Sequence, residues 1–151
     1  MKQASGYMDL ALAEARVAAE RGEVPVGAVL VDGATGQVVA QAGNETRALN
    51  DPTAHAEVLA IRRAAAALGQ ERLTGCDLYV TLEPCPMCAA AISFARLRRL
   101  YYGADDPKGG AVENGVRFYA QATCHHRPEV YAGLAAADSA ALLRDFFSSR
   151  R

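Results

Sequence analysis

The sequence of 151 residues lacks any apolar run long enough to cross a bilayer, and its start lacks the continuous apolar stretch of a secretory signal peptide. We therefore expect a cytoplasmic protein that makes no membrane contact. It also lacks an excess of either charge, since 16 Lys and Arg face 17 Asp and Glu for a net charge of −1. This balance excludes non-specific nucleic-acid binding through bulk charge, although it is compatible with a local contact to one RNA loop.

Cysteine is also scarce, with four residues at positions 76, 85, 88 and 124. In a reducing compartment their thiols stay free, so a Cys-x-x-Cys pair is expected to bind a metal or to act in redox chemistry. A chain of this length buries about 68–70% of its unfolded surface and needs no metal merely to fold. We find no linker or internal repeat and predict one domain over residues 1–151.

Hydrophobic periodicity and turn residues predict an alternating order of elements. Helices are expected over 7–21, 55–68, 87–97 and 138–147, and strands over 24–31, 37–42, 77–82 and 100–104. Leu10 is expected on the buried face of the first helix, and Ser139 as a contributor to the cap of the last. Residues 105–133 are expected to be irregular, with at most one short strand or helix. The order predicts an α/β fold, with a mixed sheet covered on both faces.

Two short motifs at predicted helix starts carry the chemistry: His55-Ala56-Glu57 and Pro84-Cys85-Pro86-Met87-Cys88. One helical turn places the sulfurs of Cys85 and Cys88 on one side, and the positive end of a helix favours thiolates. Two thiolates and the His55 imidazole supply three zinc ligands, which leaves the open position that a catalytic site needs for water. Glu57 is positioned to carry protons beside the metal, without binding it.

Other interpretations of these residues exist. The cysteine pair could be a redox pair, or part of a structural site completed by His125 or Cys124, or the chain could be a non-catalytic module stabilised by zinc. The joint spacing of His-x-Glu and Pro-Cys-x-x-Cys is more specific than either half, and it is the signature of zinc-dependent nucleobase deaminases.

Over residues 9–104 the chain resembles the bacterial tRNA-specific adenosine deaminases of the cytidine and deoxycytidylate deaminase superfamily. The most similar stretches are residues 23–29, 51–57, 81–89, 102–110 and 142–147. The resemblance implies a three-layer αβα fold, with a central mixed sheet of about five strands flanked by helices. It also implies one Zn²⁺ per subunit and a homodimer in which residues of one subunit complete the pocket of the other.

By the same resemblance, the reaction is hydrolytic deamination of adenosine to inosine at the wobble position of a tRNA anticodon. The alternative is deamination of a free nucleobase or nucleoside, of guanine or cytosine type, by the same zinc chemistry. The residues expected to contact the substrate are Val26, Asn44, Ala56, Asp105, Asp106, Lys108, Phe147 and Arg150 or Arg151.

These expected contacts differ in kind. Asn44 would hydrogen-bond the base or its ribose, although it could instead be a left-handed turn residue. Backbone donors near Ala56 and Cys85 would stabilise the tetrahedral intermediate. Phe147 would touch the anticodon loop, although it could instead pack in the core. Residues 112–119 depart from the familiar family pattern beside the substrate mouth, so they bear on the choice of substrate.

Overall fold

The computed structural model describes residues 2–150, so that Met1 and Arg151 lie outside the description. The elements follow the order α1 (Lys2–Glu20), β1 (Gly27–Asp32), β2 (Val38–Gly43), α2 (Ala56–Leu68), β3 (Cys76–Leu82), α3 (Pro86–Phe94), β4 (Arg99–Ala104), η1 (Phe118–Ala120), β5 (Glu129–Tyr131) and α4 (Ala136–Ser148). The predicted helices and strands are all present, with ends that shift by a few residues.

The five strands form one mixed sheet in the order β2-β1-β3-β4-β5. Strand β1 pairs antiparallel with both β2 and β3, whereas β3, β4 and β5 run parallel to one another. Tyr79, Tyr101 and Tyr131 stand opposite one another on β3, β4 and β5, and their rings stack across the sheet with centroids 4.4 and 4.9 Å apart. The predicted α/β fold with a mixed sheet is confirmed.

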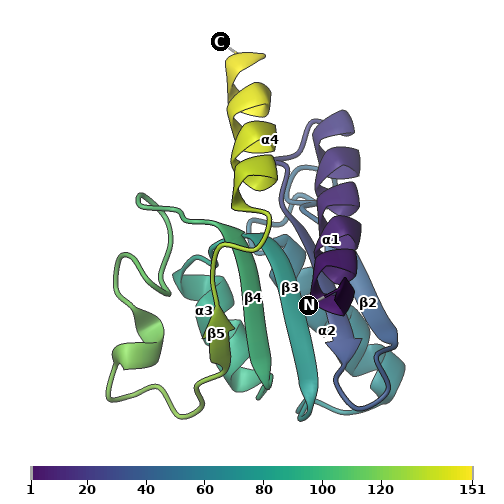
Figure 1. Ribbon diagram of the computed structural model, residues 1–151, viewed down its shortest axis with the longest axis vertical. Coiled ribbons are helices and arrows are strands. Elements are labelled where there is room, and N and C mark those ends of the chain that lie inside the picture. Colours follow the sequence, from purple (N-terminus) through teal and green to yellow (C-terminus); the bar gives the residue numbers. More distant parts are fainter. Residues whose placement is uncertain (1, 151) are drawn as a thin grey trace.

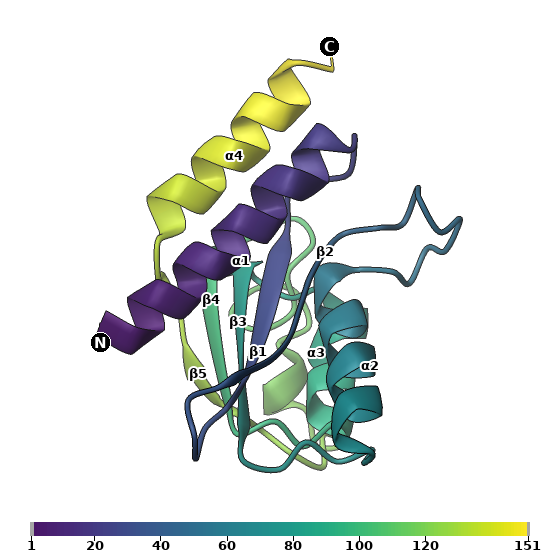
Figure 2. The ribbon, with the colours of Figure 1, turned by 90° about the vertical axis from the view of Figure 1, so that its right-hand side faces the viewer.

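Helices cover both faces of this sheet. Helices α1 and α4 lie side by side on one face, and α2 and α3 lie together on the other (Figures 1 and 2). The larger core cluster fills the α2 and α3 side around Leu30, Leu78 and Ile92, while Met8 and Leu12 of α1 pack on the opposite side. The layers are therefore αβα, as the resemblance implied.

Helix α1 packs closely on β1 at Gly27. A Cβ at this position would lie 1.9 Å from the carbonyl oxygen of Ala11, so no larger residue fits without moving the helix. The contact fixes the chain between α1 and β1, which includes Val24 and Val26, against the end of the sheet.

Three details differ from the sequence-based expectations. Residues 105–133 hold both a short helix and a strand, because β5 is stabilised by pairing with the distant β4, which local sequence does not reveal. Ser139 does not cap α4: its hydroxyl donates to the Thr81 carbonyl, and Ala135 stands at the cap position. Leu10 is 40% exposed, and Met8 and Leu12 are buried in its place. Among residues 2–150, every helix is too short or too polar to pass through a lipid bilayer.

Candidate active site

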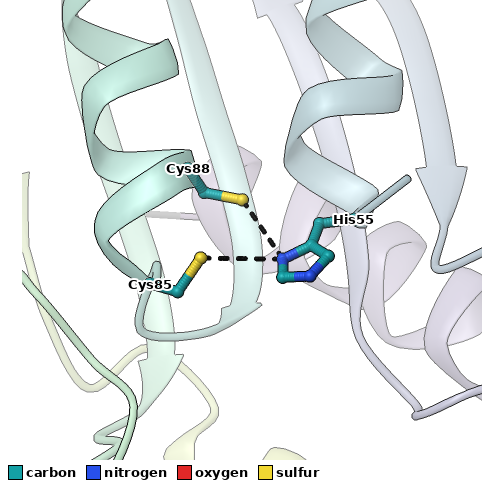
Figure 3. A group of neighbouring side chains, drawn as sticks. All are labelled: His55, Cys85 and Cys88. Carbon is teal, nitrogen blue, oxygen red and sulfur yellow. Dashed lines mark hydrogen bonds between the residues drawn. The ribbon is translucent and has the colours of Figure 1, made fainter. Parts of the chain in front are cut away.

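The two motifs meet at one end of the sheet because α2 and α3 begin side by side. His55 and Cys85 are the N-cap residues of α2 and α3, and both have extended backbone conformations. Within the described residues, neither side chain bonds the N–H groups of its own helix, as a capping residue normally does. Cys88 lies one turn into α3 and is fully buried. All three side chains point toward one another (Figure 3).

The three side chains are at the spacing that a bound metal requires. Nδ1 of His55 lies 3.6 Å from the sulfur of Cys85 and 3.5 Å from that of Cys88. A tetrahedral zinc ion with its usual bond lengths would separate nitrogen and sulfur by about 3.6 Å. Within residues 2–150, these three form the only group of three or more His, Cys, Asp or Glu side chains close enough together to hold a metal ion. The side chains therefore fit zinc, with His55 binding through Nδ1.

The structure does not support a fourth protein ligand. The sulfur of Cys124 lies 3.7 Å from the Ser93 hydroxyl and donates to the backbone carbonyl of His126, away from the three ligands. Neither Cys124 nor His125 belongs to the metal group found among the described residues. A site with three protein ligands leaves one position for water, which is the pattern of catalytic zinc.

The pKa values of the three ligand side chains are shifted in different directions. Hydrogen bonding from Cys88, with a further contribution from His55, lowers the pKa of Cys85 to about 4. The pKa of Cys88 is raised, because its thiol is the donor to Cys85 and is buried. The hydrogen bond with Cys85 raises the pKa of His55, against the effect of burial. A bound divalent cation holds both sulfurs as thiolates.

Glu57 lies beside the three ligands and is 4% exposed. It lines the same cavity as His55 and Cys85. Burial raises the pKa of its carboxyl to about 7. A carboxyl with a pKa near the working pH can both accept and release a proton, which suits a general acid and base. A cation close by would shift this value downward.

The cavity above these residues has a volume of about 260 Å³. Its other lining residues are Val24, Val26, Asn44, Thr46, Leu82, Glu83, Asp106 and Gly109. A second cavity of about 450 Å³ adjoins it, sharing Val24, Leu82, Asp106 and Gly109 and reaching Asp105, Lys108, Leu143 and Phe147. The metal site thus opens through a small chamber into a wider groove beside α4.

Residues 1–104 match the model of the cytidine and deoxycytidylate deaminase zinc-binding region. The chain belongs to this deaminase family. The cation that suits the deaminase site is therefore zinc, in agreement with the ligand spacing.

Individual relatives and solved structures show which members of the family this chain is similar to. The deaminase is 67% identical to a tRNA-specific adenosine deaminase of Agrobacterium fabrum, over 100% of this chain and 98% of that one. A protein of the same name from Bacillus subtilis is 42% identical over 100% of this chain and 92% of its own length. A structure from studies of A-to-I editing by tRNA:A34 deaminases is 70% identical, with a TM-score of 0.89 over 91% of this chain and 99% of that one.

One structure of a different deaminase is also similar. A guanine deaminase from Bacillus subtilis is 35% identical, with a TM-score of 0.63 over 80% of this chain and 85% of that one. Its 35% identity to this chain is half the 70% of the structure from the tRNA:A34 deaminase studies. The fold is therefore common to both kinds of enzyme and does not by itself distinguish their substrates.

Asn44 makes a contact within the chain that the sequence does not predict, and its contact with the substrate stays a prediction. Its backbone is not left-handed, which excludes the turn interpretation. Its side-chain Oδ1 accepts the N–H of Ala56 at 2.8 Å, which satisfies the first amide of α2 in place of a capping side chain. The Ala56 N–H is thus engaged within the chain, and the stabilisation of the intermediate by backbone donors near Ala56 and Cys85 stays a prediction. The Asn44 side chain still borders the cavity beside Val26.

Of the remaining predicted substrate residues, Asp105, Asp106, Lys108 and Phe147 line the outer groove. Asp105 and Lys108 are exposed, and Asp106 borders both cavities. Phe147 is 50% exposed on α4, whereas its neighbour Phe146 is buried, so the core-packing interpretation applies to Phe146 instead. Arg150 stacks its guanidinium on Phe146 at 3.8 Å. Arg151 lies outside the described residues.

Two buried carboxylates at the rim of the cavity were not singled out by sequence. Glu23 accepts the amides of Arg47 and Ala48 and the Thr46 hydroxyl. Glu83 accepts donors from the loop over residues 106–114. Both are 2% exposed or less. A single glutamate gives no periodic pattern in the sequence, and the donors to these two carboxylates lie 23 or more residues away. The only signal in the sequence is that Glu83 directly precedes Pro84 and Cys85.

Proposed function

We propose that this chain is a zinc-dependent hydrolase that converts adenosine to inosine at the wobble position of a tRNA anticodon. The observation that carries the proposal is the 67% identity to a tRNA-specific adenosine deaminase over the whole chain, together with an intact set of His55, Glu57, Cys85 and Cys88. The proposal assigns the reaction to the cytoplasm, where both thiols stay reduced and able to bind zinc.

The chain's own residues have separate tasks in this reaction. His55, Cys85 and Cys88 would hold the zinc, which when bound lowers the pKa of a water molecule and so supplies a hydroxide nucleophile at neutral pH. Glu57 takes up the proton that the nucleophile releases and delivers it to the ring nitrogen beside C6. Glu57 then takes the proton of the hydroxyl group now bonded to C6 and passes it to the departing amino group. The bond between C6 and the amino nitrogen breaks, so that ammonia leaves and the C6 carbonyl of inosine remains.

The cavities support an RNA loop as substrate. The inner chamber can take one extruded base between Val26, Asn44 and the zinc ligands. The outer groove continues past Lys108 to the exposed ring of Phe147. A flanking base can stack on this ring, and a phosphate can pair with the Lys108 ammonium group. Anticodon bases are unpaired, so that extruding one costs little compared with opening a duplex.

We also infer that the protein acts as a homodimer. Phe94 at the end of α3 is 73% exposed, the largest exposure among the large hydrophobic side chains of residues 2–150. It borders an open hollow between α2 and α3 with Val58, Ile61 and Ala91. A second copy of the chain on this face would remove these side chains from water. Sedimentation of the zinc-loaded protein should give the mass of two chains, and a Phe94→Glu variant should shift it toward one.

The substrate is tested by offering the zinc-loaded protein an anticodon stem-loop with adenosine at the wobble position, alongside free adenosine, guanine and cytidine. We expect inosine in the stem-loop and little ammonia from the free compounds. The matched control is the same RNA with that adenosine moved into the paired stem, where it should not react. Release of ammonia from guanine or cytidine, with the stem-loop untouched, would replace the proposal by the free-base alternative.

A further inference from the structure

The side chain of Glu83 is buried between the metal site and the loop over residues 106–114. Its Oε1 accepts the backbone N–H of Asp106 at 3.0 Å and the side-chain amide of Asn114 at 2.7 Å. Its Oε2 accepts the backbone N–H groups of Val112, Glu113 and Asn114 at 2.9–3.0 Å. A carboxylate has about four lone-pair sites, so these donors leave Glu83 no capacity to act as a base.

The loop is shaped to wrap around this carboxylate. Gly110 passes so near that a Cβ there would lie 2.5 Å from Cδ of Glu83 and 2.6 Å from the carbonyl of Asp106. The amide of Ala111 also donates to the carbonyl of Pro84, at 2.9 Å, between Glu83 and Cys85. The loop is therefore attached directly to the turn that carries a zinc ligand.

The same loop supplies one side of the nucleotide cavity. Asp106 and Gly109 border both chambers, and Lys108 borders the outer one. The Ala111 amide donates to the Pro84 carbonyl, and the turn around Asp106 is held by its own hydrogen bonds. The other hydrogen bonds between residues 106–114 and the site all end on Glu83. Glu83 also borders the inner chamber, but both of its carboxylate oxygens are engaged by the loop, so loss of the carboxylate would mainly free the loop.

We propose that Glu83 is a positioning residue that holds the 106–114 loop as a wall of the nucleotide pocket, and so determines how tightly the flanking RNA is bound. The inference rests on the proposed function, because it names the residue that shapes the RNA side of that same site. It also assigns a role to the segment that departs from the family pattern: its backbone amides and the side chain of Asn114 bind Glu83.

The main test is the Glu83→Gln variant, which keeps the size of the side chain. Either orientation of the amide turns its NH₂ group toward at least two donors. With the anticodon stem-loop as substrate, we expect KM to rise about tenfold or more, because buried donors lose their acceptor. The value of kcat and the zinc content should stay close to those of the parent. The control is Glu113→Gln, which removes an exposed charge from the same loop and should change neither constant.

Hydrogen exchange gives a readout that needs no substrate. In Glu83→Gln, the amides of residues 106 and 112–114 should exchange at least about tenfold faster, while those of β3 keep their protection. If β3 also loses protection, the variant is unfolding, and Asn114→Ala then decides. That variant removes one side-chain donor and should raise KM about threefold with kcat preserved.

Several results would overturn the proposal. An unchanged KM with unchanged loop exchange would show that Glu83 does not hold the pocket wall. A fall in kcat at constant KM would place it in the chemistry instead, and loss of zinc would make it a support of the metal site. Inactivity of the parent protein on the stem-loop would count against the proposed function, and it would be distinguishable because the loop exchange is measured without RNA.

Discussion

The zinc side and the rim of this cavity are built in different ways. On the zinc side, His55 and Glu57 are two residues apart and Cys85 and Cys88 are three apart, and each pair lies at the start of one helix. At the rim, the loops around residues 46–48 and 106–114 are held by Glu23 and Glu83, whose partners lie 23–31 residues away. The residues that carry the chemistry are therefore positioned by short spacings along the sequence. The shape of the cavity that receives the substrate depends on hydrogen bonds between residues far apart in the sequence.

This difference separates two kinds of functional loss. Changes on the zinc side should reduce turnover and leave the affinity for RNA unchanged. Changes at the rim should weaken RNA binding and leave the zinc content unchanged. The guanine deaminase of Bacillus subtilis has the fold in common with this chain, so the fold alone does not choose the substrate.

The largest effect is expected from Cys88→Ala. Cys88 is fully buried and its sulfur faces Nδ1 of His55 at 3.5 Å, so its removal leaves zinc with two ligands. We expect zinc content and turnover to fall below detection while the far-ultraviolet circular dichroism persists, because the core does not depend on the metal. Elemental analysis measures the zinc. The control is Cys124→Ala, a buried cysteine outside the metal group, which should keep its zinc; equal loss in both variants would mean that Cys124 supports the site.

The next largest effect is expected from Glu57→Gln. The amide fills the same space and cannot relay a proton, so kcat should fall by about 10²–10⁴-fold, the range for general acid–base groups. Zinc content should stay at one per chain, since Glu57 is not a ligand. Ammonia release and elemental analysis together check this. A variant that deaminates at the parent rate would remove Glu57 from the proton path.

At the rim, Phe147→Ala and Phe146→Ala form a matched pair. Phe147 is half exposed beside the outer groove, so its loss should raise KM for the stem-loop by about fivefold to a hundredfold, as for the loss of one base stack, without changing Tm. Phe146 is buried, and its truncation should instead destabilise the protein by about 3–5 kcal/mol. Kinetics and thermal unfolding separate the two. If Phe147→Ala lowers Tm and leaves KM unchanged, the ring has a structural role.

The smallest effect concerns acid stability. Burial tends to raise the pKa of Glu83 and of Glu23, but their hydrogen bonds to the loop amides outweigh it and lower both below the ordinary 4.5. A carboxyl with a lowered folded-state pKa stabilises the fold above its unfolded pKa, and this contribution is lost as the pH falls through the folded value. The free energy of unfolding should therefore decrease below about pH 4.5. In Glu83→Gln, denaturant titrations over this range should give a shallower decrease; an equal slope would contradict the assignment.

Much of the fold and the whole metal set could be predicted from the sequence. Apolar periodicity predicts the helices and the first four strands, and the motifs around His55 and Cys85 predict the three residues that the fold brings together as zinc ligands. Strand β5 was missed because three residues carry no pattern of their own and depend on β4. The engagement of the Ala56 amide by Asn44 was missed for a similar reason, since a contact over 12 residues of loop leaves no periodic signal.

The most direct test of the account is X-ray absorption at the zinc edge of the fully metallated protein. We predict two sulfur ligands at about 2.3 Å, one nitrogen at about 2.0–2.1 Å and one further light atom from solvent, which is the open position on which the reaction depends. The same spectrum for His55→Ala should lose the imidazole signal. A first shell filled by four protein ligands, or one with a single sulfur, would contradict the account.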